Sequence, residues 1–272
     1  MHFKKSNQNH STVLHDGKVP YLTFRKLDQA GAVHGFSTRM GGVSKGIFAT
    51  MNLSYHRGDD KEAVDENFRR IGEAIGFDPK KLVFSNQIHE TRICKVTEKD
   101  CGKTMTNMDG LVTNVKGVPL YTGYADCVPL FFYDPCKKVA ALAHSGWRGT
   151  AGKIGAKMTR VMKEEYGCKA KDIVAAIGPS ICRDCYEVSQ DVADVFRKVL
   201  EGHEEAEYMD DKGNGKYQLD LWKINEIILL EAGIRKENLD VTDICTCCNS
   251  QYLFSHRASH GRRGNLAAFI VL

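Results

Sequence analysis

The stretch that decides the fold is ADCVPLFFYDPCKKVAALAHSGWRG, residues 125–149. Two apolar segments flank the dipeptide Asp134-Pro135, which favours a tight turn. The pattern predicts a β-hairpin whose open end brings Cys127 and His144 opposite each other. A thiolate beside an imidazole suits two chemistries, a shared metal ion or an ion pair that makes the cysteine a nucleophile.

A third candidate ligand lies upstream, in SNQIH at residues 85–89. A predicted strand ends there in polar residues, which would present His89 at the end of a sheet. Three protein ligands with an open fourth position are typical of a catalytic zinc site, whereas structural sites are closed by four ligands. Sulfur with two imidazoles suits zinc and also copper, and zinc is the metal that we favour.

The rest of the chain alternates between short apolar runs and amphipathic stretches, without an internal repeat or a linker. Strands are predicted over residues 21–24, 33–37, 82–84, 91–96, 111–113, 119–124, 128–133, 139–144, 173–177 and 267–271, the last inside a sheet. Helices are predicted from apolar residues on one face: Val64, Phe68, Ile71 and Ile75; Ile154, Met158 and Val161; Val192, Val195, Phe196 and Val199; and residues 221–232. Asp59 or Asp60 could cap the first helix and Ser189 the third.

The predicted fold class is α/β (α+β): a single layered domain over residues 1–272, with mixed β-sheets flanked by helices. The strands between Gly110 and Ser145 follow one another with short turns, so we expect antiparallel or mixed pairing there. Residues 1–20 are expected to form a flexible N-terminal segment. No glycine-rich dinucleotide or phosphate loop opens a helix, so neither cofactor class is predicted.

Composition bounds the partners of the protein. The net charge of +4 is small for 272 residues and the basic residues are dispersed, so no nucleic acid is expected as a partner. No apolar run is long enough to cross a membrane and no secretory signal is visible, so we expect a cytoplasmic protein without a membrane partner. Ten cysteines are then expected as reduced thiols. No obligatory protein partner is inferred.

Several motifs, in order along the chain, resemble the YfiH family, long labelled the laccase-domain or polyphenol oxidase family. The matching segments are HGFSTRMGGVSKGIFATMNLS (34–54), QIH (87–89), DGLVT (109–113), ADCVPL (125–130), HSGWRGT (144–150), GPSICRDCYEV (178–188), CTCCNSQYLFSHR (245–257) and a glycine- and arginine-rich closing segment. The resemblance spans residues 33 to 272. It implies a layered α/β fold with mixed sheets, distantly related to toxin-type cysteine hydrolases.

The resemblance also implies a function: zinc-dependent purine nucleoside phosphorylase. Adenosine, inosine and S-methyl-5'-thioadenosine would react with phosphate to give the free base and a ribose 1-phosphate, with adenosine deamination as a side activity. The family's metal ligands correspond to His89, Cys127 and His144, which would hold one zinc ion per chain. Zinc could polarise the base, bind phosphate or activate water for deamination.

Phosphorolysis needs an anion held against C1 of the ribose, so arginines beside glycines are candidates for phosphate binding. Arg39 in STRMGG and Arg148 in GWRG fit this role, and Arg257 in SHR is a further predicted substrate-binding residue. Arg39 and Arg148 could instead tie loops to backbone carbonyls. Many family members carry a second arginine after the SHR-like motif and a T-G-R run, both of which this chain lacks. Arg262, Arg263 or His260 could remake those contacts.

Four further polar residues have predicted roles. Asn52 and Gln87 are expected to contact the sugar or base edges. Asp109 is a predicted catalytic residue and Asp126 a possible partner, each of which could orient a ligand imidazole or handle the proton. The Asp109-Gly110 pair could instead simply shape a turn.

Two more cysteine pairs, Cys182/Cys185 and Cys245/Cys248, have together the ligand count of a closed zinc site. Because two predicted helices separate the pairs, packed thiols near the active-site rim are the favoured interpretation. His203 lies in the acidic run EGHEEAE, where a solvated surface is a better account than a deaminase motif.

Three alternative functions stay open from the residues. The first is a metal-free hydrolase with Cys127 as nucleophile and His144 as base. The second is a copper-dependent polyphenol oxidase, although one cysteine and two histidines fall short of a multicopper ligand set. The third is a non-catalytic binding protein whose zinc stabilises the fold.

Overall fold

The burial of the central hairpin determines the layering of the protein. The computed structural model describes residues 1–5 and 11–272. Every residue of β9 (Val128–Asp134) and β10 (Val139–Ser145) is buried, so both faces of these strands are covered. Alternate residues point to opposite sides: Phe131 joins the core between two sheets, whereas Phe132 joins the core beneath the helices.

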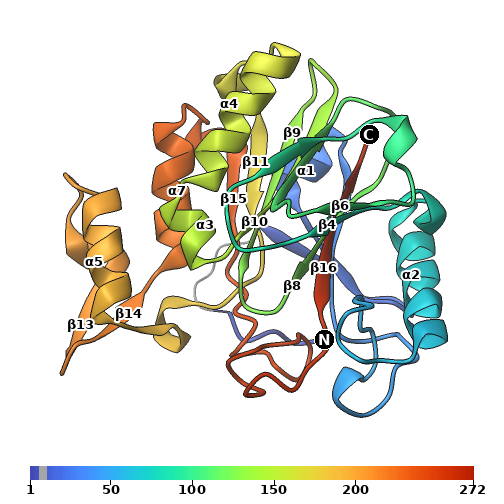
Figure 1. Ribbon diagram of the computed structural model, residues 1–272, viewed down its shortest axis with the longest axis horizontal. Helices are drawn as coiled ribbons and strands as arrows, with labels where there is room; N and C mark the ends of the chain where they lie inside the picture. Colours follow the sequence, from blue (N-terminus) through green and yellow to red (C-terminus); the bar gives the residue numbers. More distant parts are fainter. Residues whose placement is uncertain (6–10) are drawn as a thin grey trace.

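Two large mixed sheets pack face to face, and helices cover both outer sides (Figure 1). The seven-stranded sheet has the order β1 (Thr12–His15), β2 (Tyr21–Phe24), β3 (Val33–Ser37), β16 (Leu266–Val271), β8 (Leu120–Tyr124), β4 (Val83–Asn86) and β6 (Thr104–Thr106). The six-stranded sheet has the order β15 (Leu239–Val241), β11 (Val174–Ile177), β9, β10, β7 (Gly110–Thr113) and β5 (Ile93–Lys95). The predicted fold class, α/β with mixed sheets flanked by helices, is confirmed.

The helices follow from their apolar faces. On the outer side of the seven-stranded sheet, α2 (Lys61–Ile75) buries Val64, Phe68 and Ile71. On the outer side of the six-stranded sheet lie α4 (Ile154–Tyr166) and α7 (Leu221–Glu231). The remaining α-helices are α1 (Arg25–Ala30), α3 (Trp147–Ala151), α5 (Gln190–Val199) and α6 (Glu205–Tyr208). Short 3-10 turns are η1 (Gly46–Phe48), η2 (Pro79–Lys81), η3 (Glu98–Asp100), η4 (Ala170–Asp172), η5 (Arg183–Cys185) and η6 (Lys236–Asn238).

The predicted caps met different outcomes. The Asp60 side chain accepts a hydrogen bond from the Ala63 amide and caps α2 as predicted. Ser189 precedes α5 but makes no capping hydrogen bond, because its hydroxyl donates to the Asp191 carboxylate instead.

All the predicted strands are present, and the hairpin pairs Leu142 with Phe131 in antiparallel register. The last strand lies inside a sheet as predicted, because β16 pairs with β3 and β8. The pairing between Gly110 and Ser145 differs in one respect from a simple meander. β8 belongs to the seven-stranded sheet while β7 and β9 belong to the six-stranded one, so the chain changes sheets twice within this stretch.

Several described strands were not predicted: β1, β6, β15 and a small third sheet of β12 (Glu187–Ser189), β14 (Lys216–Leu219) and β13 (Met209–Gly213). The third sheet lies with α5 at the left of Figure 1. Its residues 209–216 read MDDKGNGK, an acidic and glycine-rich pattern that lacks the apolar alternation typical of strands.

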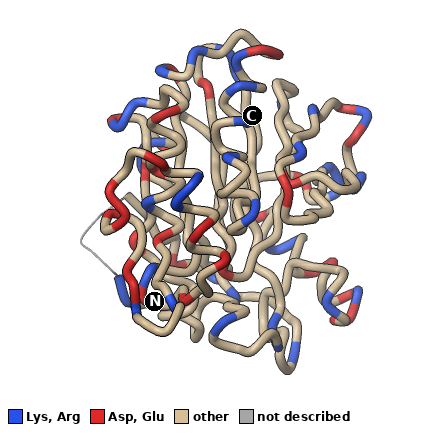
Figure 2. The backbone as a smooth tube through the Cα atoms, turned by 60° about the vertical axis from the view of Figure 1, so that its left-hand side comes forward, with Lys and Arg blue, Asp and Glu red and all other residues tan. Residues whose placement is uncertain are grey.

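The N-terminal segment 1–20, expected to be flexible, contains strand β1 at Thr12–His15, and its residues 6–10 lie outside the described part of the structure. Residues of both charge signs are interspersed along the backbone (Figure 2). Within the described residues, no helix combines the length and apolar character that crossing a membrane requires.

Candidate metal centre

The candidate site lies where the chain crosses between the two sheets. One crossing follows β4 and carries His89, and another follows β8 and carries Cys127. His144 is near the end of β10, beside both crossings. The candidate ligand atoms of the three residues all lie within 4.8 Å of one another. The structure therefore brings together the three side chains that the sequence pattern proposed as a set.

A single buried carboxylate, that of Asp109, positions both histidines. It accepts hydrogen bonds from the backbone amides of Ile88 (3.2 Å), His89 (2.9 Å) and Glu90 (3.0 Å). The same carboxylate lies 3.0 Å from Nδ1 of His144. Because a carboxylate accepts, Nδ1 carries the proton and Nε2 of His144 is left as the ligand atom.

Two residues of the centre adopt left-handed backbone conformations, which residues other than glycine rarely take. His89 has φ 62° and Asp126, the neighbour of Cys127, has φ 85°. The Asp126 carboxylate accepts hydrogen bonds from the Thr246 hydroxyl (2.6 Å) and the Arg257 amide (2.7 Å). These contacts hold the turn that presents Cys127, and they fasten it to the C-terminal part of the chain.

Gly146 gives the centre its room. A Cβ atom at this position would lie 3.2 Å from the Cys127 sulfur, 3.3 Å from Cδ2 of His89 and 3.5 Å from Cε1 of His144. Contacts of 3.2 and 3.3 Å are tighter than nine in ten real Cβ contacts, so any side chain would push on Cys127 and His89 while only touching His144. This glycine lies inside the HSGWRG motif, but no role in the site was predicted for it.

The Cys127 thiol and the His144 imidazole shift each other's pKa. Burial raises the pKa of Cys127, but His144 and His89 beside it outweigh burial and lower that pKa to about 6. Burial lowers the pKa of His144, but the Cys127 thiolate and the Asp109 carboxylate outweigh burial and raise it to about 9. In the absence of a metal, the pair is therefore a thiolate and an imidazolium near neutral pH.

The donor set fits a metal ion by its chemistry. One thiolate and two imidazoles converge. A bound cation would take the place of the proton that lies between Cys127 and His144 in the metal-free protein. All three residues border a cavity of about 850 Å³, so a further coordination position can face that cavity. A volume of this size lies within the range of small-molecule sites.

The cavity combines aromatic walls with basic groups. The aromatic residues that line it include Phe84, Tyr121, Tyr124 and Tyr186. The basic residues that line it include His56, Arg57, Lys61, His256, Arg257 and Arg263. Among the described residues that line the cavity, Asp126 alone carries a carboxylate. An excess of positive charge beside aromatic surface favours a ligand that has both an anionic part and a flat ring.

Two predicted substrate residues line the cavity, and both already use their polar groups. The Gln87 side chain donates to the Gly123 carbonyl and accepts from the Gly123 amide, each at 2.9 Å. The Arg257 guanidinium donates to the carbonyls of Cys185 (2.9 Å) and Glu187 (3.2 Å). Both side chains therefore also hold backbone in place.

Arg39 and Asn52 do not line the cavity. Arg39 donates to the carbonyls of Ala49 and Ser250 and stacks on the Phe254 ring, which is the loop-tying alternative for this arginine. Asn52 is fully buried and fixes the backbone around it. Arg148 stacks on Trp147 and lines a smaller cavity of about 100 Å³, which His89 and Cys127 also border.

Sequence reasoning missed several cavity residues. Arg57 precedes a glycine in HRGDD, the signal used for other arginines, but it was not singled out. Arg263 lies beside a glycine and was considered as a replacement contact, but it was not predicted as a substrate-binding residue. In the structure, burial lowers its pKa to about 10. Tyr124 ends a predicted strand and Tyr186 lies in a family motif, yet no pattern in one sequence shows that their rings face a cavity.

Fold and site together define a mixed α/β protein with a cysteine–histidine centre that could hold a metal ion at the wall of a basic cavity. The chain belongs to the family described as multi-copper polyphenol oxidoreductase laccase, whose model matches residues 33–272. The family predicted from the motifs is confirmed.

Similar proteins cover nearly the whole chain. It is 38% identical to purine nucleoside phosphorylase YlmD of Bacillus subtilis (strain 168) over 245 residues, 88% of this chain and 87% of that protein. The crystal structure of YlmD from Geobacillus stearothermophilus superposes with a TM-score of 0.88 at 35% identity and covers 99% of this chain and 98% of that one. The crystal structure of the Bacillus licheniformis hypothetical protein YfiH gives a TM-score of 0.91 at 32% identity, over 97% and 99%.

Replacing Gly146 with alanine tests the geometry of the centre. Because the new methyl group would press on Cys127 and His89, we expect the affinity for zinc to fall on the order of 10-fold, measured by competition with a chromophoric chelator. Gly17→Ala is the matched control, since no atom lies within 4 Å of the added carbon. Equal affinities in the two variants would contradict a metal held between these side chains.

The thiolate of Cys127 predicts a distinct pH dependence of alkylation in metal-free protein. Its pKa of about 6 means that iodoacetamide should modify Cys127 at neutral pH and more slowly as the pH falls through 6. Burial raises the pKa of Cys94, so this thiol should react only at higher pH. Peptide mass spectrometry measures both rates, and the same pH profile for the two cysteines would refute the ion pair. Added zinc should protect Cys127 and leave the rate at Cys94 unchanged.

Proposed function

We propose that this protein is a zinc-dependent purine nucleoside phosphorylase. The proposed substrates are adenosine, inosine and S-methyl-5'-thioadenosine, with adenosine deamination as a side reaction and zinc bound by His89, Cys127 and His144. The observation that carries the proposal is the convergence of these three donors at the wall of a basic, aromatic cavity. The names of the similar proteins support the same reaction.

The basic residues of the cavity suit the phosphate. Arg57 and Arg263 present guanidinium groups, which bind phosphate oxygens through paired hydrogen bonds. The Arg263 guanidinium also donates to the Asn265 side chain, which limits its freedom before an anion arrives. A partly buried arginine binds an anion more strongly than an exposed one, because less water screens the charges.

The aromatic residues suit the purine and the ribose. Tyr121 is held by a hydrogen bond from its hydroxyl to the Leu53 carbonyl, and Tyr124 by one to the Thr122 hydroxyl. Their rings are therefore fixed surfaces, against which a flat base can pack with little loss of entropy. Tyr186, like Cys127, borders both this cavity and the smaller one.

The proposed reaction balances without an external oxidant or reductant. An oxygen of dihydrogen phosphate forms a bond to C1 of the ribose while the bond from C1 to the purine nitrogen breaks. The bonding electron pair leaves with the purine, which takes up the proton that the phosphate releases. Arginines that hold the phosphate near C1 lower the barrier by positioning and by stabilising charge in an oxocarbenium-like transition state.

When bound, zinc would supply a Lewis acid beside the base or the phosphate. The protein's own part is to keep its ligands in place. Asp109 fixes the orientation of His144 and the backbone of His89, so its proposed role is that of a positioning residue.

The same geometry favours one second candidate, a metal-free cysteine hydrolase. Cys127, His144 and Asp109 follow one another as nucleophile, base and orienting carboxylate, and the thiolate of Cys127 is formed near neutral pH. Copper chemistry has less support. A blue-copper site has a weak axial ligand, usually methionine, and the described residues that line the cavity include none.

Incubation with adenosine and phosphate tests the proposal. We expect adenine and ribose 1-phosphate in equal amounts, detected by liquid chromatography and mass spectrometry, and a loss of about 100-fold or more in Cys127→Ala. Removal of zinc with a chelator should stop the reaction, and zinc should restore it. Product formation that needs no phosphate and no metal would favour the hydrolase, and oxidation of phenols with copper alone would favour the oxidase.

Arg263→Gln tests the phosphate site separately. Loss of one charged hydrogen-bonding partner should raise KM for phosphate by about 10-fold and leave KM for adenosine nearly unchanged. The neighbouring Arg262→Gln is the matched control, because Arg262 is exposed and does not border the cavity. Equal effects of the two substitutions would remove Arg263 from phosphate binding.

A further inference from the structure

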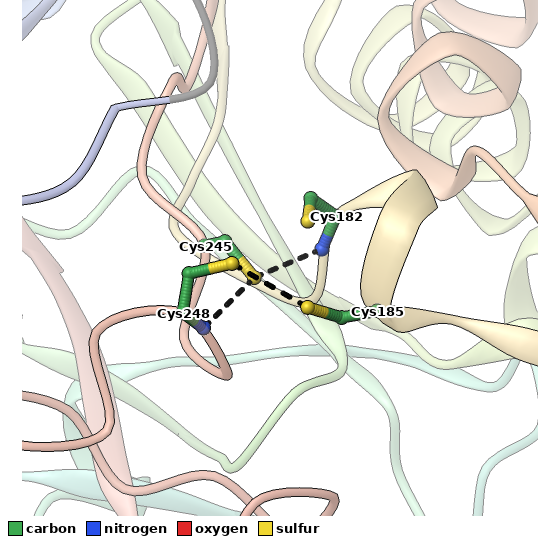
Figure 3. Close-up of side chains that lie close together, drawn as sticks. All are labelled: Cys182, Cys185, Cys245 and Cys248. Carbon is green, nitrogen blue, oxygen red and sulfur yellow. Dashed lines mark hydrogen bonds between the residues drawn. The ribbon is translucent and has the colours of Figure 1, made fainter.

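Two pairs of cysteines from distant parts of the chain meet outside the candidate metal centre. Cys182 and Cys185 lie at the two ends of the turn that includes η5, and Cys245 and Cys248 lie in a turn after β15. The four sulfur atoms all lie within 4.8 Å of one another, and Figure 3 shows the side chains converging. The two pairs are far apart in the sequence, which counted against a shared site, but the fold places them side by side.

The spacing of the sulfur atoms suits a tetrahedral ion. Zinc bonds sulfur at about 2.3 Å, which places the four sulfurs of a tetrahedral site roughly 3.8 Å apart. In the structure, the sulfurs of Cys185 and Cys248 are 3.4 Å apart and none of the four is more than 4.8 Å from another. Small side-chain rotations would complete the coordination shell.

Backbone amides already point at one of the sulfurs. The amides of Cys182 (3.3 Å) and Cys248 (3.4 Å) both donate to the sulfur of Cys245 (Figure 3). Hydrogen bonds of this kind stabilise a thiolate relative to a thiol and fix its orientation, as the outer partners of metal ligands do. Cys182 is 5% exposed and Cys245 is 2% exposed, so a thiolate there would need a compensating cation.

We propose that Cys182, Cys185, Cys245 and Cys248 form a second zinc site, closed by four thiolates. Because no coordination position is left for a substrate, this site is structural. The proposal is independent of the reaction proposed above, since it uses none of the residues of the His89–Cys127–His144 centre.

The site would fasten together two segments that shape the cavity. The first segment also contains Ile181 and Tyr186, which line the cavity. The second contains Thr246, whose hydroxyl donates to the Asp126 carboxylate beside Cys127. Arg257 joins them again by donating to the carbonyl of Cys185. A zinc ion here would hold the wall of the cavity at a fixed distance from the first centre.

A disulfide is the alternative use of these thiols. All ten cysteines, which lie in the described part of the chain, are free in the structure. A disulfide needs a bond of about 2.05 Å, well below the 3.4 Å between the sulfurs of Cys185 and Cys248, and it would remove the thiolates that hold a metal. Four converging sulfurs, two of them deeply buried, favour the metal.

Metal analysis of the full-length protein, purified with reductant and without added metal, tests the proposal. Cys182→Ser and Cys245→Ser should each lose one zinc per chain relative to the unsubstituted protein. Cys247→Ser is the matched control: Cys247 lies between Cys245 and Cys248 but outside the cluster, and its substitution should keep that zinc. Zinc that depends on Cys182 identifies this site whatever the metal content of the other centre.

X-ray absorption at the zinc edge gives a second measurement that does not rely on the folding of the serine variants. In His89→Ala, which perturbs the first centre alone, the remaining zinc should show four sulfur neighbours at about 2.3 Å. A zinc content unchanged by Cys182→Ser, iron in place of zinc, or a shell with nitrogen or oxygen would overturn the proposal. So would an intact mass, without reductant, that is two hydrogens short in the unsubstituted protein but not in Cys185→Ser.

Discussion

The hydrogen bonds that the Asp109 carboxylate accepts hold the candidate centre together. The carboxylate is fully buried at the start of β7, in the six-stranded sheet, and its partners are three consecutive amides of the crossing after β4 and the imidazole of His144. Burying a carboxylate costs free energy unless hydrogen-bond donors surround it. The backbone around His89 must therefore keep its amides directed at the Asp109 carboxylate. His89, whose amide is one of these donors, has a left-handed backbone conformation. Without this carboxylate, the hydrogen bonds that orient His89 and His144 toward Cys127 would be lost.

Much of the fold could be predicted from the sequence because the central strands are apolar and short. The hairpin around Asp134-Pro135, the placement of β16 inside a sheet and the apolar face of α2 follow from local patterns. The assignment of β8 to the other sheet could not be predicted, because sequence order shows which strands are neighbours along the chain and not which sheet each one joins. The third sheet was missed because its residues 209–216 carry charges and glycines in place of the apolar alternation typical of strands.

The candidate site was predictable to a similar depth. Residue chemistry and the family motifs indicated the triad, and the structure places its donors together. The roles of surrounding polar residues depend on which atoms they meet. Arg39 has the glycine neighbours of a phosphate-binding arginine, yet its guanidinium is taken up by two backbone carbonyls. The four-cysteine cluster shows the opposite case, in which residues far apart in sequence were set aside and the fold brings them into contact. Long-range placement of this kind is what a single sequence does not contain.

The position of β16 has a consequence for how the molecule is made. This strand, from residues 266–271, separates the β1-β2-β3 half of its sheet from the β8-β4-β6 half, and Ala267 bonds a residue 230 positions earlier. During synthesis on the ribosome, the edges of β3 and β8 that pair with β16 therefore stay unpaired until residues 266–271 have emerged. Sheets assembled from such distant strands form slowly, and exposed edges invite pairing with other chains. Newly made copies therefore expose the edges of β3 and β8 until the last strand pairs with both.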